Sequence, residues 1–93
     1  MHALKWSSQA RADLLTIIDY IANDNLDAAQ RLKDEINHKV TKLLAHPKLY
    51  KIGRVNHTRE MLVRSNYVVI YSEQQETIKI LRVLHVARQF PVI

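Results

Sequence analysis

Arginine, tyrosine and histidine side chains recur through three strand-like runs in the second half of the sequence: Thr58–Val63, Tyr67–Ser72 and Thr77–Val86. A guanidinium group binds phosphate or carboxylate through paired, charge-assisted hydrogen bonds. A sheet built from these runs presents guanidinium, phenol and imidazole groups on a surface, with apolar residues behind them. We therefore predict a surface that binds an acidic macromolecule.

Five side chains of this half are the predicted binding residues: Arg54, Arg59, Arg82, His85 and Arg88. Arg59, Arg82 and His85 also have structural alternatives, because strand side chains can brace a neighbouring strand, form salt bridges or pack. For Arg82, which interrupts an apolar alternation, the alternative is a buried salt bridge with Glu60. For His85 it is a hydrogen-bonded packing role.

Charge is distributed unevenly along the 93 residues. The first 45 residues carry six Lys/Arg and six Asp/Glu, whereas the remainder carries eight Lys/Arg and three Asp/Glu and so holds the whole net charge of +5. A local positive field raises the encounter rate with polyanions or acidic proteins. The asymmetry favours binding by the second half, with a basic surface kept for solubility as the alternative.

The elements that position these side chains begin with a short strand at His2–Trp6. A helix is predicted from Ser8 to Asn23, capped by a serine hydroxyl, with Leu14 and three isoleucines at helical spacing on one face. Asp13 and Asp19 fall off this apolar stripe, which predicts that both are solvated.

A second helix is predicted from Asp27 to Ala45, with Asp27 as its cap and Gln30 in a capping-box position. His46-Pro47 ends it. Residues 48–57 form a loop, and the three later runs are joined by turns at 64–66 and 73–76, which predicts antiparallel pairing. The fold class is α+β, in the order β-α-α-β-β-β, with a helical hairpin on a small sheet of mainly antiparallel strands, and residues 1–93 form one domain.

Composition excludes several classes of function. The chain has no cysteine and a single glycine, so thiolate chemistry, disulfides and a glycine-rich phosphate loop are ruled out. No apolar run suits a signal peptide or a membrane span, so we expect a cytoplasmic protein without membrane contact. Histidines and acids are not clustered, so neither a metal site nor another cofactor is expected.

A set of short motifs, in chain order, resembles the RelE/ParE toxins of bacterial type II toxin–antitoxin modules: Ala12-Asp13-Leu14, Ile17–Ala22, Ala28-Ala29, His46-Pro47, Gly53-Arg54, Thr58-Arg59-Glu60, Tyr67–Tyr71 and Arg82–Arg88. The resemblance spans nearly the whole chain, and the predicted element order matches the family fold. It implies a growth-arresting, plasmid-stabilising toxin that a cognate antitoxin neutralises in a hetero-oligomer.

The family includes two activities, and the sequence is compared with both. RelE-like members cleave messenger RNA on the ribosome, whereas ParE-like members inhibit DNA gyrase by binding it. An arginine that RelE-like nucleases place after the tyrosine opening the third strand corresponds here to Val68, and Phe90-Pro91-Val92-Ile93 offers no counterpart of their C-terminal tyrosine. These departures favour gyrase inhibition without catalytic residues. The alternatives are a ribosome-dependent mRNA endonuclease and a non-toxic module that only binds its partner.

The antitoxin is expected to bind the neutral helical hairpin and an open sheet edge, by adding a strand or laying a helix in an apolar groove. Three apolar residues off the main stripes are predicted to serve this contact: Leu15, Leu26 and Leu44.

Overall fold

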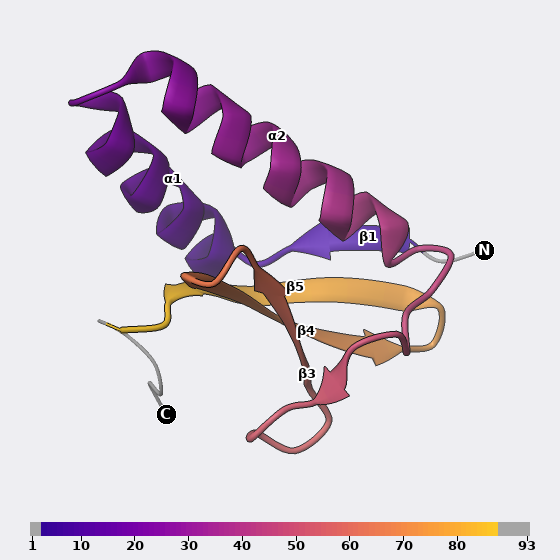
Figure 1. The fold of residues 1–93 in the computed structure, drawn as a ribbon. Coiled ribbons are helices and arrows are strands. Elements are labelled where there is room, and N and C mark those ends of the chain that lie inside the picture. The colour runs from indigo at the N-terminus through magenta and orange to yellow at the C-terminus, as the bar shows by residue number, and fades with distance from the viewer. Residues whose placement is uncertain (1–2, 88–93) are drawn as a thin grey trace.

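The computed structural model describes residues 3–87 as two helices on one face of a five-stranded sheet (Figure 1). The elements are β1 Ala3–Trp6, α1 Ser8–Ala22, α2 Leu26–Lys42, β2 Lys51–Ile52, β3 Arg59–Val63, β4 Tyr67–Gln74 and β5 Thr77–His85. The predicted α+β class and element order are confirmed. The short β2 was not predicted, because its two residues lie within the segment assigned to a loop.

The sheet has the strand order β1-β5-β4-β3-β2, and only the β1–β5 pair is parallel. The three consecutive strands β3, β4 and β5 pair through tight turns, as predicted. The last turn consists of Gln75 and Glu76, whose φ angles of 48° and 63° match the right-handed twist of the flanking strands. The strand β4 therefore extends to Gln74, two residues beyond its predicted end.

Side-chain hydrogen bonds define where both helices begin. The Ser7 hydroxyl accepts from the Ala10 N–H at 2.9 Å, as expected for a serine cap. The predicted cap of α2 was wrong: Asn25, with extended backbone angles, accepts from the Ala28 N–H at 3.0 Å. Asp27 instead lies in the first turn, where its negative charge interacts favourably with the positive end of the helix dipole.

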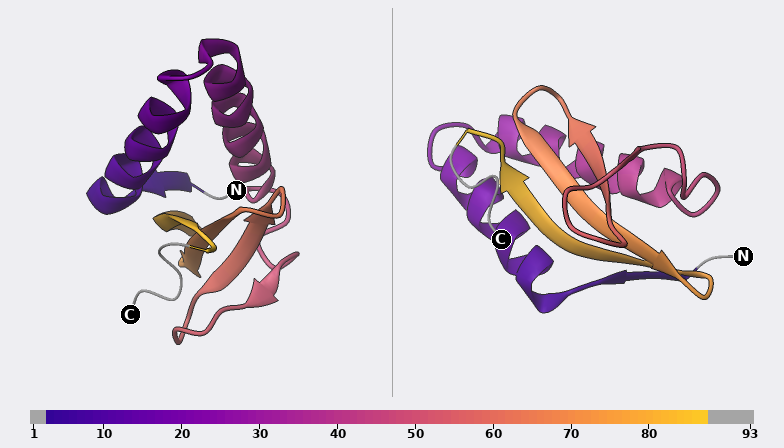
Figure 2. Two further views of the ribbon diagram at one scale, coloured as in Figure 1. Left: turned by 60° about the vertical axis from the view of Figure 1, so that its left-hand side comes forward. Right: turned by 90° about the horizontal axis from the view of Figure 1, so that it is seen from below.

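The core lies between the helical hairpin and the sheet, and Figure 2 shows both helices on the same side of the strands. The helix α2 contributes one apolar face, and the strands contribute alternate residues. The fully buried members include Leu32, Ile36, Val40, Met61, Val69, Tyr71, Ile78, Ile80 and Val83. The Tyr71 hydroxyl reaches the edge of this core and donates to the Pro47 carbonyl at 2.8 Å. Burial raises the pKa of this phenol above 10.0, opposed by the nearby Arg59 guanidinium.

A β-bulge in β5 changes which side chains face the helices. Ile70 pairs with Arg82 but the next residue, Tyr71, pairs with Ile80, so Leu81 is the extra residue. Ile78, Ile80 and Val83 consequently belong to one core cluster. The expectation that Arg82 alternates on the same face as the two isoleucines was therefore wrong.

The deepest residues of α1 are Ala10 and Asp13 rather than the predicted stripe, whose members are half-buried against the core. Asp13 is 7% exposed, so the prediction that it is solvated was wrong. Its carboxylate accepts from Arg82 Nε at 2.7 Å, from Arg82 Nη2 at 3.1 Å and from the Val83 N–H at 3.0 Å. It thereby fixes α1 against the outer edge of β5.

These donors outweigh the cost of burying the charge. Burial is the largest single influence on the Asp13 carboxyl and raises its pKa, but the hydrogen bonds from Arg82, Val83 and Gln9 together hold the pKa below 3.8. The same hydrogen bonds raise the pKa of the Arg82 guanidinium above its ordinary value. The charged pair is therefore the stable form at neutral pH.

We predict that Asp13→Asn lowers the free energy of unfolding by about 2–4 kcal/mol at neutral pH, because it removes the counter-ion of a partly buried guanidinium. Chemical denaturation measures this difference. The control is Asp19→Asn on the exposed side of the same helix, which should change stability by less than about 0.5 kcal/mol.

The same variant has a predicted pH dependence. Because the folded-state pKa of Asp13 is depressed, its stabilisation is fully present above the unfolded pKa near 3.8 and disappears as the pH falls through the folded value. The stability difference between the wild type and Asp13→Asn should shrink below about pH 4. A difference that stays constant down to pH 2 would contradict the ion pair.

Candidate functional site

The structure separates the predicted binding residues instead of gathering them at one place. Arg82 is held by Asp13, so the alternative of a salt bridge between Arg82 and Glu60 was wrong. Its side chain is 29% exposed, and both the Nε and one Nη of its guanidinium are engaged. Arg82 therefore joins α1 to the sheet.

Arg59 has a similar bracing role. Its Nη1 donates to the Tyr50 carbonyl at 2.7 Å, which ties β3 to the segment that leads into β2. Backbone pairing of Ile52 with Arg59 continues the same contact. The Arg59 guanidinium thus holds residues 50–52 beside β3.

His85 lies on the helix-facing side of the sheet. Its ring meets the Tyr67 ring edge-on, with centroids 5.4 Å apart and an interplanar angle of 86°. Both rings line a hollow of about 230 Å³ between α1 and the end of β5, together with Asp13, Thr16, Ile17, Tyr20 and Ile21. His85 is therefore placed on the face opposite to that of Glu60 and Leu62.

The opposite sheet face carries a larger hollow of about 470 Å³, which we call the open-face hollow. Its lining residues come from β2, β3, β4 and the segments next to them: Leu49, Tyr50, Lys51, Arg54, Glu60, Leu62, Val68 and Val86. Within residues 3–87, both helices lie on the other side of the sheet (Figures 1 and 2). Of the predicted residues, Arg54 belongs to this hollow, and Arg88 lies outside the described residues.

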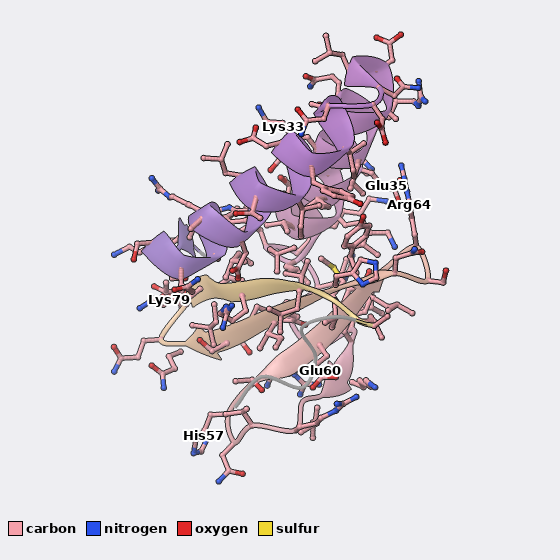
Figure 3. All side chains as sticks on the ribbon, turned by 90° about the vertical axis from the view of Figure 1, so that its left-hand side faces the viewer. Lys33, Glu35, His57, Glu60, Arg64 and Lys79 are labelled. Carbon is pink, nitrogen blue, oxygen red and sulfur yellow. The ribbon has the colours of Figure 1, made fainter. Side chains whose placement is uncertain are left out.

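Glu60 is the acidic residue among the side chains that line the open-face hollow. It is 5% exposed, and Figure 3 shows it on the side of the sheet away from the helices. Its Oε2 accepts from the Arg54 N–H at 3.0 Å and lies 4.0 Å from Arg54 Nε, while its Oε1 lies 3.6 Å from Lys51 Nζ. The alternative raised from the sequence, which paired Glu60 with Arg82, gave Glu60 the wrong partner.

Gly53 allows this arrangement through close packing. A Cβ at this position would overlap the Thr58 Oγ1 atom and come within 3.3 Å of the Glu60 side chain. The Gly53 N–H donates to the Thr58 carbonyl at 2.8 Å, and the Thr58 hydroxyl donates to the Val55 carbonyl at 2.7 Å. The loop between β2 and β3 is thereby closed on itself, with His57 at its tip in the left-handed region, φ 66° (Figure 3).

The rim of the open-face hollow is cationic. The side chains of Lys51 and Arg54 are 72% and 50% exposed, whereas that of Glu60 is 4% exposed. Residues 46–59 contain four Lys/Arg and no acid. The buried Glu60 carboxylate lies close to both cations, and the side chains of Lys51 and Arg54 remain largely exposed to solvent. The sequence signal for this site was the acid-free segment, which includes Lys51, a residue that sequence reasoning did not select.

Residues 3–87 contain no group of three or more histidine or acidic side chains placed to hold a metal ion. None of the helices they form is both long and apolar enough to cross a membrane.

Of the predicted antitoxin contacts, Leu15 and Leu26 lie on the helical hairpin, and Leu44 lies in the turn after α2. Leu15 and Leu26 are 61% and 74% exposed, whereas Leu44 packs partly buried against the core. Leu15 borders a second apolar hollow, of about 440 Å³, on the outside of the hairpin. This hairpin hollow is lined by Trp6, Arg11, Leu14, Leu15, Ile18, Lys33 and Asn37.

The sequence and the fold match one class of known proteins. Residues 4–90 match the family described as the ParE toxin of the parDE type II toxin–antitoxin system. The chain is 31% identical over 88 residues to toxin RelE2 of Caulobacter vibrioides, covering 95% of this chain and 99% of the relative. It is 30% identical over 90 residues to a Sinorhizobium fredii protein named as toxin Y4kP, covering 97% of this chain and 94% of that one.

A solved structure agrees with these relatives. The chromosomal ParDE toxin–antitoxin system of P. aeruginosa includes a chain that superposes with a TM-score of 0.79 at 27% identity, covering 91% of this chain and 96% of that one. The chain therefore belongs to the ParE toxin family of type II toxin–antitoxin systems, within the ParE/RelE superfamily.

We predict that Gly53→Ala destabilises the fold by about 1–3 kcal/mol, because the added methyl group displaces Thr58 and opens the loop. Thermal melting measures the effect. Thr58→Ala removes the atom that the methyl group meets, so the double variant should be less destabilised than the sum of the two single variants. Strict additivity would show that the close packing at Gly53 is not the cause.

Proposed function

We propose that this toxin inhibits DNA gyrase by binding it, without catalytic residues of its own, and that a cognate antitoxin neutralises it. The observation that carries the proposal is the separation of the polar groups on the sheet. Arg82 and Arg59 are engaged within the fold, and His85 faces the helices, whereas Lys51 and Arg54 border the opposite face.

This separation matters because RNA cleavage by attack of the 2′-hydroxyl needs several groups at one phosphate. A base or orienting group, an acid for the leaving oxygen and cations around the phosphate must converge within hydrogen-bond distance. In the described part of the chain, the His85 imidazole and the exposed side chains of Lys51 and Arg54 lie on different faces of the sheet. A binding toxin needs no such convergence.

A ribosome-dependent mRNA endonuclease is the second candidate function, and two observations favour it. One relative is named toxin RelE2. In addition, the Glu60 carboxylate lies beside Lys51 and Arg54, which gives a potential base next to two cations. Against it, Glu60 is buried and already accepts the Arg54 N–H.

Two parallel assays distinguish these candidates. Purified toxin should inhibit supercoiling of relaxed plasmid by purified gyrase, and it should leave messenger RNA intact in a reconstituted translation reaction. Toxin already bound to its antitoxin is the control and should have no effect on gyrase. Cleaved message with unaffected supercoiling would replace the proposed function by the second candidate, and no growth arrest on induction would favour a non-toxic module.

The antitoxin is proposed to bind the hairpin hollow. An amphipathic helix or extended segment could place apolar side chains against Leu14, Leu15 and Ile18, while Arg11 and Lys33 at the border suit acidic flanking residues. The similar P. aeruginosa chain belongs to a ParDE toxin–antitoxin system, which supports a partner of this kind.

We predict that Leu15→Asp weakens antitoxin binding at least about tenfold, because it places a charge in an apolar contact. Binding of the protein encoded by the neighbouring reading frame, measured by calorimetry, tests this. Val55→Asp, at the loop on the far side of the molecule, is the matched control and should bind normally. Equal binding by both variants would place the antitoxin elsewhere.

A further inference from the structure

We propose that residues 88–93 fold back over the open-face hollow, with the Phe90 side chain seated between Leu62 and Val86. These six residues lie outside the described residues, whereas the surface that receives them belongs to residues 3–87. Neither gyrase nor the ribosome is needed for this contact.

The open-face hollow is lined by apolar side chains that remain in contact with solvent. Leu49, Leu62 and Val86 are 66%, 52% and 37% exposed, although they line one concave surface of about 470 Å³. In the described part of the chain, both helices cover the other face of the sheet (Figure 1). Because gathered apolar surface is stabilised by removal from water, the hollow favours an apolar occupant.

The charge of the rim does not select the occupant. The Glu60 carboxylate lies 3.6 Å from Lys51 Nζ and 4.0 Å from Arg54 Nε, so both cations already have an acidic partner. A further carboxylate gains little there, because ion pairs between exposed groups contribute little free energy. The apolar lining therefore determines what binds in the hollow.

The chain itself brings a segment to this surface. Val86 lines the hollow, and its N–H donates to the Asn66 carbonyl at 2.7 Å, which fixes the point where the described chain leaves the sheet. The Ala87 N–H donates to His85 Nδ1 at 3.2 Å, within the turn that follows β5. Segment 88–93 therefore begins at the border of the hollow.

The composition of segment 88–93 suits an apolar surface. No residue of the segment is acidic, and four of the six are apolar: Phe90, Pro91, Val92 and Ile93. From Val86 to Phe90 an extended chain spans up to about 13 Å, which exceeds the roughly 8 Å edge of a cube of the hollow's volume. The Phe90 ring can therefore enter the hollow.

The covalent connection favours this segment over a free partner. A segment joined by a few residues meets its site at an effective concentration in the millimolar range. Seated in the hollow, segment 88–93 covers Leu62 and competes with any partner that approaches this face of the sheet. The apparent affinity of such a partner falls to the fraction of molecules in which the hollow is open.

The first test uses the whole chain, isotopically labelled at its single phenylalanine, Phe90. We expect nuclear Overhauser contacts from the Phe90 ring to the methyl groups of Leu62 and Val86. A ring without contacts, or one that contacts Tyr20 and Tyr67 at the other face of the sheet, would overturn the proposal. A mixture of labelled and unlabelled chains identifies a second copy as the occupant, and contacts found only between chains would also overturn it.

The second test measures chemical access to the hollow. Because the chain has no cysteine, Leu62→Cys introduces a single thiol whose reaction rate with a maleimide can be followed. Adding Phe90→Asp should raise this rate at least about fivefold, because a charged side chain leaves the apolar hollow and opens it. The control is Leu15→Cys on the exposed hairpin, which should react equally fast with and without Phe90→Asp. Equal rates at position 62 in the two backgrounds would contradict the proposal.

Thermal melting tests the same contact by its contribution to stability. Phe90→Ala should lower the Tm by about 4–8 °C but have little further effect in the Leu62→Asp background, because both changes remove one contact. Gln89→Ala, the neighbouring change to a polar residue, should leave the Tm unchanged. An unaltered Tm for Phe90→Ala, or strict additivity with Leu62→Asp, would count against the contact. None of these measurements uses gyrase, so their outcome leaves the proposed function untouched.

Discussion

The carboxylate of Asp13, bound to Arg82 and to the Val83 N–H, is the contact on which the rest of the arrangement depends. The strand β5 is nine residues long and β1 only four, so β5 continues beyond the end of its neighbour. There α1 replaces the missing strand: the Ser7 N–H donates to the Ile80 carbonyl, the Ser7 hydroxyl donates to the Leu81 carbonyl, and Asp13 accepts the next available N–H. Backbone groups that a short β1 would leave unpaired are thus satisfied by the start of the helix.

This contact also fixes the two faces of the molecule. With α1 held at the edge of β5, the hairpin covers one sheet face and leaves the other outside the helix layer (Figure 1). Each of the two buried acids, Asp13 and Glu60, binds a different set of cations. Asp13 binds Arg82 within the fold, whereas Glu60 holds the loop that carries Arg54 and, with it, the basic rim of the open-face hollow. A chain of this size thereby presents an apolar hollow on the hairpin and a basic one on the sheet, on opposite sides.

Much of the fold was predictable because it depends on local patterns. The serine cap, the half-buried apolar stripe of α1 and the tight turns of β3–β5 follow from neighbouring residues, whereas α2 ends at Lys42, three residues before its predicted end. The element order followed from the same periodicities and turns, and it matched the fold of the family whose motifs the sequence resembles. The site was less predictable, because a charged residue's partner can lie far away in sequence: Asp13 and Arg82 are separated by 69 positions. The pairing predicted for Arg82 chose Glu60, which instead binds residues six to nine positions before it.

The sequence by itself determined the α+β class, the basic second half and the resemblance to toxins, because these depend on composition, periodicity and motif order. Tertiary structure decided which cations are available at the surface. The bulge at Leu81 changed the phase of β5, so that Val83 and His85 lie on the helix-facing side of the sheet while Arg82 binds Asp13 of α1. A change of phase by a single residue moves every later side chain to the other face of a strand. No local pattern records it, because it results from packing β4, β5 and α1 together.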